Sequence, residues 1–108
     1  MNKAAKTQIE QEYKTLFEHV FNKEVWVSWG KHRYQLTLTE IRVPKQSDIY
    51  NLPDKRDVDG KLKTPTVLQF VFRSGATFDV VYEDITSAAL TTRGITLLIG
   101  ATKITFEL

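Results

Sequence analysis

From residue 23 onward, apolar and polar residues alternate over most of the chain, as in a sheet with one buried and one exposed face. In the first such stretch, apolar side chains occupy every second position on both sides of Gly30-Lys31-His32, which predicts a β-hairpin. The apolar positions of its two strands are Val25, Val27 and Trp29, then Tyr34, Leu36 and Leu38. The alternation changes phase near Glu40, which predicts a bulge or a sharp bend in the second strand.

The C-terminal part of the chain contains further strand patterns. Val67–Phe72 is apolar on both faces, as in a strand covered on both sides. Short turns separate it from strands predicted at 77–85, 87–91, 95–99 and 103–108. Because these strands follow one another without a crossover helix, the sheet is predicted to be antiparallel. Six or seven strands in so short a chain favour a small barrel or a strongly curled sheet.

The N-terminal segment predicts one amphipathic helix. Its apolar residues recur with helical spacing at Ile9, Tyr13, Leu16, Phe17, Val20 and Phe21. Thr7 and Glu10 have the spacing of a capping box, whereas residues 4–6 are good helix formers that extend the helix forward, so two starts remain open. Asn22 is the predicted end. We expect this helix to pack over an open end of the sheet, because its polar side carries both acidic and basic residues, unlike a membrane-lying helix.

These patterns give an α+β, mainly β fold class: an N-terminal helix followed by a strongly bent antiparallel sheet of six or seven strands that closes into a small barrel. The 108 residues are predicted to form a single small-barrel domain, 1–108, with a capping helix at 1–22. Residues 44–65 contain all three prolines and many charges, which predicts a long charged loop without regular structure. Loops of this length are unusual in compact domains and are often functional.

The motifs of common catalytic and cofactor sites are absent from the sequence. Cysteine does not occur, which excludes disulfides and thiolate metal ligands. The five glycines are isolated, so no phosphate-binding loop is expected, and His19 and His32 lack the spacing of a metal site. We therefore expect no catalytic residue, no cofactor and no metal. A triad assembled in space leaves an enzyme as a remote alternative.

Charge and hydropathy set further expectations. No stretch has the length and hydropathy of a secretory signal or a membrane span, so we expect a cytoplasmic protein without membrane contact. The net charge is only +2, and residues 1–65 hold twelve Lys and Arg against nine Asp and Glu. This excess is too small to indicate nucleic-acid binding unaided.

The hairpin turn WGKHRY combines basic and aromatic side chains. Basic groups attract phosphates, and aromatic rings stack on bases. Trp29, Lys31, His32 and Arg33 are therefore the candidate nucleic-acid-binding residues. The alternative is that Trp26 or Trp29 belongs to the core while the basic residues only solubilise the hairpin tip, because one strand face must be buried.

Two stretches resemble the motifs of Sm-like proteins. VLQFVFRSGATFDVVYEDI is similar to their first motif, an alternating strand, a short glycine turn and a second strand that leads to an acidic residue. GITLLIGATKITFEL resembles their second motif, in which a strand begins near a glycine and a turn leads to a final alternating strand. The resemblance covers residues 66–108 plus the N-terminal helix. It implies an Sm-like or SH3-like barrel, rings formed through paired edge strands, and RNA binding.

The sequence departs from the Sm-like pattern at two points. Ile99 stands before Gly100, where the family has an arginine that helps to clamp RNA bases. Asp84 is followed by Ile-Thr-Ser-Ala, where the family has Asp-x-x-x-Asn. The RNA-binding residues of the family therefore have no counterpart in this chain. The hairpin at 25–43 is additional to, or replaces part of, the five-strand plan of the family.

A second resemblance involves FDVVYEDITSAALTTRGITLLI, which is similar to bacterial pleckstrin-homology-like domains. Those domains are seven-strand barrels that finish with a helix plugging the barrel. No such helix follows here, and the N-terminal helix would have to take over its role. This resemblance implies an adaptor domain that binds a protein partner.

The alternation runs to Leu108, which predicts a terminal strand with an unpaired edge. Such an edge is a template for another chain unless charges blunt it, as Lys103 and Glu107 would here. We therefore expect a non-enzymatic binding or assembly module that self-associates through edge strands. Single-stranded nucleic acid is its first expected ligand, and a protein partner is the alternative.

Overall fold

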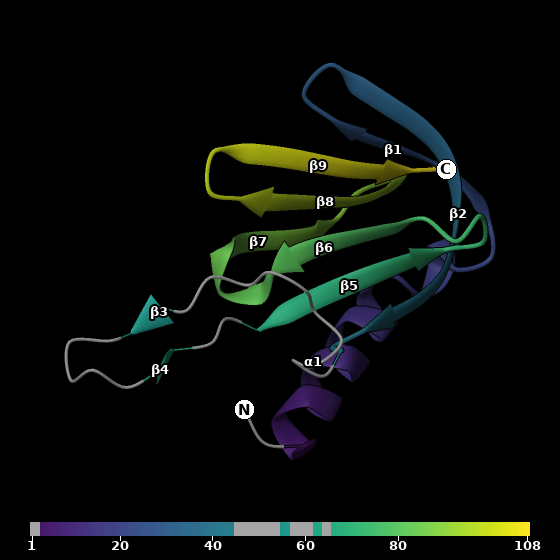
Figure 1. The fold of residues 1–108 in the computed structure, drawn as a ribbon. Helices are drawn as coiled ribbons and strands as arrows, with labels where there is room; N and C mark the ends of the chain where they lie inside the picture. The colour runs from purple at the N-terminus through teal and green to yellow at the C-terminus, as the bar shows by residue number, and fades with distance from the viewer. Residues whose placement is uncertain (1–2, 45–54, 57–61, 64–65) are drawn as a thin grey trace.

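The computed structural model describes residues 3–44, 55–56, 62–63 and 66–108, with side chains for 4–44 and 66–108. Helix α1 (Lys3–Leu16) and a 3-10 turn, η1 (Glu18–Val20), precede the strands (Figure 1). The strands are β1 (Glu24–Trp29), β2 (His32–Arg42), β3 (Lys55–Arg56), β4 (Leu62–Lys63), β5 (Val67–Phe72), β6 (Thr77–Val81), β7 (Ile85–Leu90), β8 (Gly94–Ile99) and β9 (Thr102–Glu107). A second 3-10 turn, η3 (Tyr82–Asp84), joins β6 to β7.

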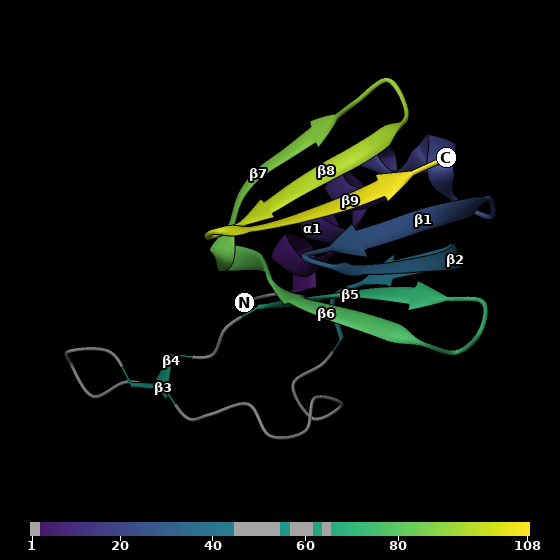
Figure 2. The same ribbon diagram turned by 90° about the horizontal axis from the view of Figure 1, so that it is seen from above.

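The main sheet has seven strands in the order β6-β5-β2-β1-β9-β8-β7, and every neighbouring pair is antiparallel. Figure 2 shows this order from β7 to β6, with α1 behind the sheet. The predicted mainly β class, the antiparallel pairing and the first hairpin are confirmed. The predicted bulge is also confirmed, because the pairing of β2 with β5 shifts register between Leu38 and Glu40.

Helix α1 begins earlier than a capping box would place it. It starts at Lys3, so the good helix formers at 4–6 extend it and Thr7 lies inside it. Glu10 instead accepts a hydrogen bond from the backbone N–H of Val43 at 2.8 Å, which ties the helix to the end of β2. The helix ends at Leu16 rather than Asn22. Asn22 has a φ of +60° and donates its N–H to Leu38 at 2.9 Å, so it marks the entry into β1.

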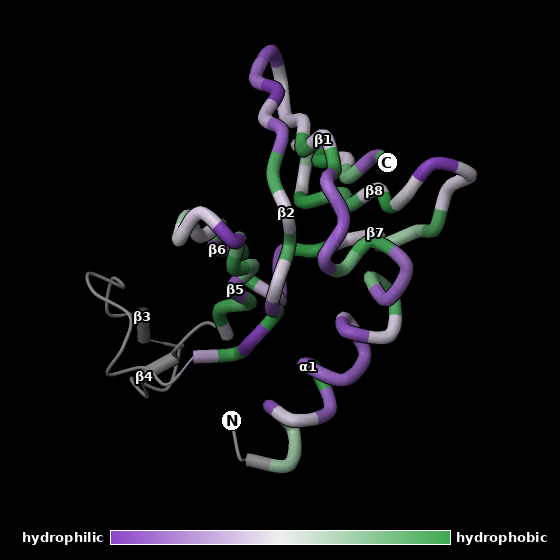
Figure 3. Tube along the Cα trace, turned by 90° about the vertical axis from the view of Figure 1, so that its right-hand side faces the viewer, coloured by the Kyte–Doolittle hydropathy of each residue, from purple (hydrophilic) through white to green (hydrophobic). Residues whose placement is uncertain are grey.

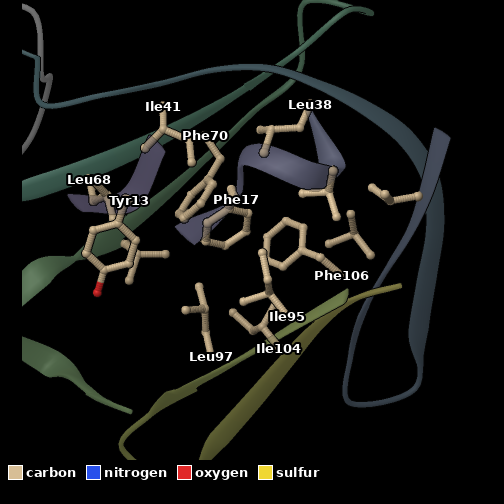
Figure 4. Packing of buried hydrophobic residues seen from close by; sticks show 14 of the residues in the cluster. Tyr13, Phe17, Leu38, Ile41, Leu68, Phe70, Ile95, Leu97, Ile104 and Phe106 are labelled. Carbon is tan, nitrogen blue, oxygen red and sulfur yellow. The ribbon is translucent and has the colours of Figure 1, made fainter. Parts of the chain in front are cut away.

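The core lies between α1 and the concave face of the sheet. At its centre, the ring of Phe17, which directly follows α1, lies 5.3 Å from the ring of Phe70 and 5.0 Å from that of Phe106 (Figure 4). All three side chains are fully buried. They are surrounded by aliphatic residues from both halves of the sheet: Val25, Val27, Leu38, Ile41, Leu68, Ile95, Leu97 and Ile104. The helix therefore packs against the sheet, but on its concave face rather than over an open end as predicted.

The predicted loop at 44–65 is not wholly irregular. Two short strands, β3 and β4, form a separate antiparallel pair in which Lys55 lies opposite Lys63 and Arg56 opposite Leu62. Strands of two residues are too short to produce a recognisable alternation, which explains why the sequence pattern does not reveal them. The remaining residues of this segment, 45–54, 57–61 and 64–65, lie outside the described part of the chain.

The predicted barrel closure is wrong, because the sheet stays open between β6 and β7. These two strands are its edges, and they diverge from η3 in Figure 2. At the end of β6, Tyr82 still pairs with the β5 side by donating its N–H to Thr66 at 2.8 Å. The Glu83 carboxylate also accepts the Thr66 N–H, at 3.1 and 3.2 Å. These bonds hold η3 beside β5, so the chain turns away there instead of pairing β7 with β6.

The terminal strand is not an edge, contrary to the sequence-based expectation. β9 lies between β1 and β8, with Phe106 opposite Val27 on one side and Ile95 on the other. The approach to β8 is so close that a Cβ on Gly94 would collide with the Phe106 carbonyl group. Lys103 and Glu107 therefore belong to an interior strand and do not guard an edge.

We expect the Phe17→Ala substitution to lower the free energy of unfolding by about 3–5 kcal/mol, because it leaves a cavity between Phe70 and Phe106. Phe17→Leu keeps most of the volume and should cost less. Leu108→Ala is the control, since this side chain is 52% exposed and surface changes usually stay within about 0.5 kcal/mol. Denaturant unfolding measures the three values, and equal losses for Phe17→Ala and Leu108→Ala would contradict this core.

Candidate functional site

The β1–β2 hairpin divides the four candidate residues between its two faces. In its register, Trp29 lies opposite His32, and Ser28 lies opposite Arg33. Residues opposite one another share a face, and successive residues alternate between faces. Trp29 and His32 therefore lie on the concave, core-facing side, whereas Arg33 lies on the convex side.

An aromatic cluster extends the core along the concave face of the hairpin. We define it by Trp29, His32, Tyr34 and Phe78. The Trp29 ring stacks on Phe78 of β6 with centroids 5.2 Å apart, and it lies 5.4 Å from the Tyr34 ring. His32 is nearly parallel to Tyr34, with centroids 6.4 Å apart and 12° between the planes. Trp29 is half-buried against the core, while Tyr34 is 46% exposed. The cluster therefore has an inner side packed against the core and a solvent-exposed outer side.

The convex face carries a separate cation–π pair. The Arg33 guanidinium carbon lies 4.3 Å from the centre of the Trp26 ring, which is itself 36% exposed. A cation at this distance is attracted by the ring quadrupole. Arg33 is thus held against the opposite face of the hairpin from the aromatic cluster, so the two sets of side chains do not form one continuous surface.

The tip of the hairpin consists of Gly30 and Lys31. Gly30 has a φ of +57°, which favours glycine, and Lys31 is exposed beside it. Figure 3 shows this protruding tip as a hydrophilic segment of the tube. The structure therefore places Lys31 at the tip, between the two faces.

Sequence reasoning missed two residues of the aromatic cluster. Tyr34 belongs to the same turn, and period-two alternation from His32 would have placed it beside that residue. Phe78 reaches Trp29 from a strand far along the chain, and no local pattern signals this contact. The alternative interpretation, that one tryptophan joins the core, holds in part for Trp29 and not for Trp26.

A groove of about 380 Å³ lies at the opening of the sheet, between α1, η3 and β7. Its lining residues are Glu12, Tyr13, Tyr82, Glu83, Ile85, Thr86, Ser87 and Ala88. The Tyr13 and Tyr82 rings meet edge to face at 6.1 Å. Burial raises the pKa of Tyr13 to about 12, with smaller contributions from Glu12 and Tyr82.

Potential metal ligands are scattered over the part of the chain that the structure describes. Within that part, no group of three or more His, Asp or Glu side chains is placed to hold a metal ion. Neither is any helix of the described residues long and apolar enough to span a membrane.

Comparisons with known proteins return no relative: the chain matches no protein-family model, no curated protein and no solved structure at a significant level. The Sm-like and pleckstrin-homology-like resemblances therefore stay predictions.

We expect Tyr13 to make the folded state sensitive to alkali. Its pKa is about 12 in the folded chain against an ordinary value of 10.0, so folding favours the protonated phenol. This contribution is complete below pH 10 and is lost as the pH rises towards 12, by about 2 kcal/mol at most. Tyr13→Phe should remove that part of the alkaline destabilisation. Unfolding free energies of both proteins measured between pH 8 and 12 test this, and parallel curves would contradict it.

Proposed function

We propose that this chain is a small non-enzymatic module that binds single-stranded nucleic acid on its β1–β2 hairpin. The observation that carries the proposal is the exposed outer side of the aromatic cluster beside Lys31. Tyr34 and His32 offer near-parallel ring faces, and the ring of Trp29 supports them from the core side. Stacking of bases on such rings tolerates any sequence, because every base has a π-face.

The arrangement separates attraction of phosphates from stacking of bases. Lys31 at the tip is exposed and presents a cation next to the rings. Trp26 and Arg33 on the convex face would hold a strand that passes round the hairpin, since a guanidinium above an indole leaves its N–H groups available for phosphate. The low net charge of +2 suits moderate affinity that depends on stacking as much as on charge.

The number of strands bears on which of the two family resemblances fits better. Seven strands exceed the five-strand plan of Sm-like proteins, so an Sm-like relationship requires the first hairpin to be an addition. Seven is the strand number that the pleckstrin-homology-like resemblance implies, with α1 covering the core in place of a C-terminal helix. That observation favours the second candidate function, an adaptor that binds a protein partner.

The double substitution Lys31→Ala with Arg33→Ala should weaken binding of a single-stranded oligonucleotide and reduce its salt dependence. Removing one phosphate-binding cation reduces the slope of log K against log salt by about 0.7 for a single strand. Fluorescence anisotropy at several salt concentrations measures both quantities. Lys23→Ala is the matched control, because Lys23 is exposed at the opposite end of β1. Unchanged binding by the double variant would exclude the hairpin as the site.

Tyr34→Ala should weaken binding by about 1–3 kcal/mol, roughly 5- to 150-fold, without changing the salt slope, because a stacking platform carries no charge. Tyr34→Phe keeps the ring and should bind like the parent. Trp26→Ala tests whether the strand also follows the convex face. Competition binding on one labelled oligonucleotide compares the three variants, and a Tyr34→Ala protein that binds as tightly as Tyr34→Phe would contradict stacking at this position.

A further inference from the structure

Strand β7 is an edge with little cover on either face. Thr86, Ser87, Ala88, Ala89 and Leu90 are all exposed, although successive residues of a strand point to opposite faces. No residue from Ile85 to Thr92 is charged. A long uncharged edge of this kind is what soluble proteins normally avoid, because it pairs readily with another strand.

The backbone groups that β7 presents outward follow from its pairing with β8. The N–H of Thr91 donates to the Gly94 carbonyl at 2.8 Å, so these two residues form a hydrogen-bonded pair. In an antiparallel ladder such pairs alternate with non-hydrogen-bonded ones, and Ala89 opposite Thr96 is therefore the next hydrogen-bonded pair. Ala88 and Leu90 then direct their N–H and carbonyl groups away from β8. No partner for these outward groups appears among the described residues.

The other edge of the sheet is protected by charge. β6 carries the exposed Asp79. The Phe72 N–H donates to the Ala76 carbonyl, so these two residues form a hydrogen-bonded pair of the β5–β6 ladder. By the same alternation of pairs, Asp79 is in a non-hydrogen-bonded pair and directs its backbone N–H and carbonyl groups away from β5. A charge in the middle of an edge strand opposes pairing with another copy of that strand. β7 is thus the edge strand that carries no charge to oppose pairing.

We propose that β7 pairs antiparallel with β7 of a second copy of this chain, around a two-fold axis at Ala89. In this register Ala88 of each copy lies opposite Leu90 of the other, and both pairs exchange N–H and carbonyl bonds. Ala89 faces its own counterpart in a non-hydrogen-bonded pair, where the backbones approach most closely and a small side chain fits best. The two sheets then become one.

The side chains on both sides of this contact are complementary. Ala88 and Leu90 share the face of their partners Leu97 and Ile95, which are buried, so they continue the core face into solvent. The 61% exposed Leu90 would be covered by the second copy. Beyond the strand, the antiparallel direction brings Arg93 of one copy towards the groove of the other.

That groove supplies opposite charge. Glu12 and Glu83 line it next to residues 85–88, and Arg93 stands three residues beyond Leu90. Opposite charges at the rim of an interface steer association and fix the register. A second copy therefore matches the edge in strand direction, side-chain size and charge, which favours it over an unrelated peptide as the occupant.

Cross-linking through Ala89→Cys tests the proposal, because the chain has no cysteine of its own. Cα atoms of a non-hydrogen-bonded pair lie about 4.5 Å apart, within the range of a disulfide. We expect mild oxidation to convert most of this variant to a covalent dimer. Ala76→Cys and Ala101→Cys, exposed in the turns after β5 and β8, control for random collision and should not cross-link.

Light scattering of the unmodified protein, free of nucleic acid and at high concentration, provides the second readout. We expect twice the mass of one chain. Ala88→Pro, which removes an outward N–H without touching the β7–β8 ladder, should restore the mass of one chain, whereas Thr77→Pro at the start of β6 should not. A monomeric parent protein, a dimer that survives Ala88→Pro, or cross-linking equal to that of the turn controls would each overturn the proposal. None of these outcomes bears on the hairpin, since no oligonucleotide is present.

Discussion

The pairing of β1 with β9 is the contact on which the rest of the structure depends. Its four residue pairs, from Trp26 opposite Glu107 to Trp29 opposite Ile104, join two separate antiparallel units, β6-β5-β2-β1 and β9-β8-β7. Only when they are joined does Phe106 lie beside Phe70, 5.5 Å from ring to ring, with room for Phe17 above both. Each half alone would leave an apolar face without cover. Because this ladder closes a loop of most of the chain, its formation costs the largest conformational entropy.

Specific hydrogen bonds and one aromatic contact surround the opening of the sheet. Two carboxylates hold the described ends of the segment between β2 and β5: Glu10 accepts the Val43 N–H, and Glu83 accepts the Thr66 N–H. The second bond also fixes η3, and the Tyr13 ring of the helix packs against Tyr82 of that turn. The helix and η3 therefore meet at the opening of the sheet, where Tyr13 and Tyr82 line the groove beside the start of β7.

Local patterns predicted the features that depend on neighbours in sequence. The period of two located the hairpins, and the phase change near Glu40 located the bulge. The position of β9 and the failure of closure depend on contacts between distant segments, about which alternation carries no information. The candidate site shows the same division. The turn WGKHRY indicated the hairpin as the candidate site, but only the register shows that Arg33 faces away from Trp29, and only the curl of the sheet brings Phe78 to Trp29.

The strand order connects the two proposals, nucleic-acid binding on the β1–β2 hairpin and dimerisation through β7. β7 is an edge, whereas the hairpin of β1 and β2 lies in the middle of the sheet, three strands away. A second copy paired through β7 would repeat the hairpin on the far side of the axis, seven strand spacings from the first. At about 4.8 Å per spacing the two hairpins lie some 34 Å apart along a flat sheet, and closer if the joined sheet curls. One nucleic-acid strand long enough to reach both would bind the second hairpin at a high effective concentration. A hairpin with few charges and moderate affinity would gain most from such pairing, because its second contact would form at a high effective concentration.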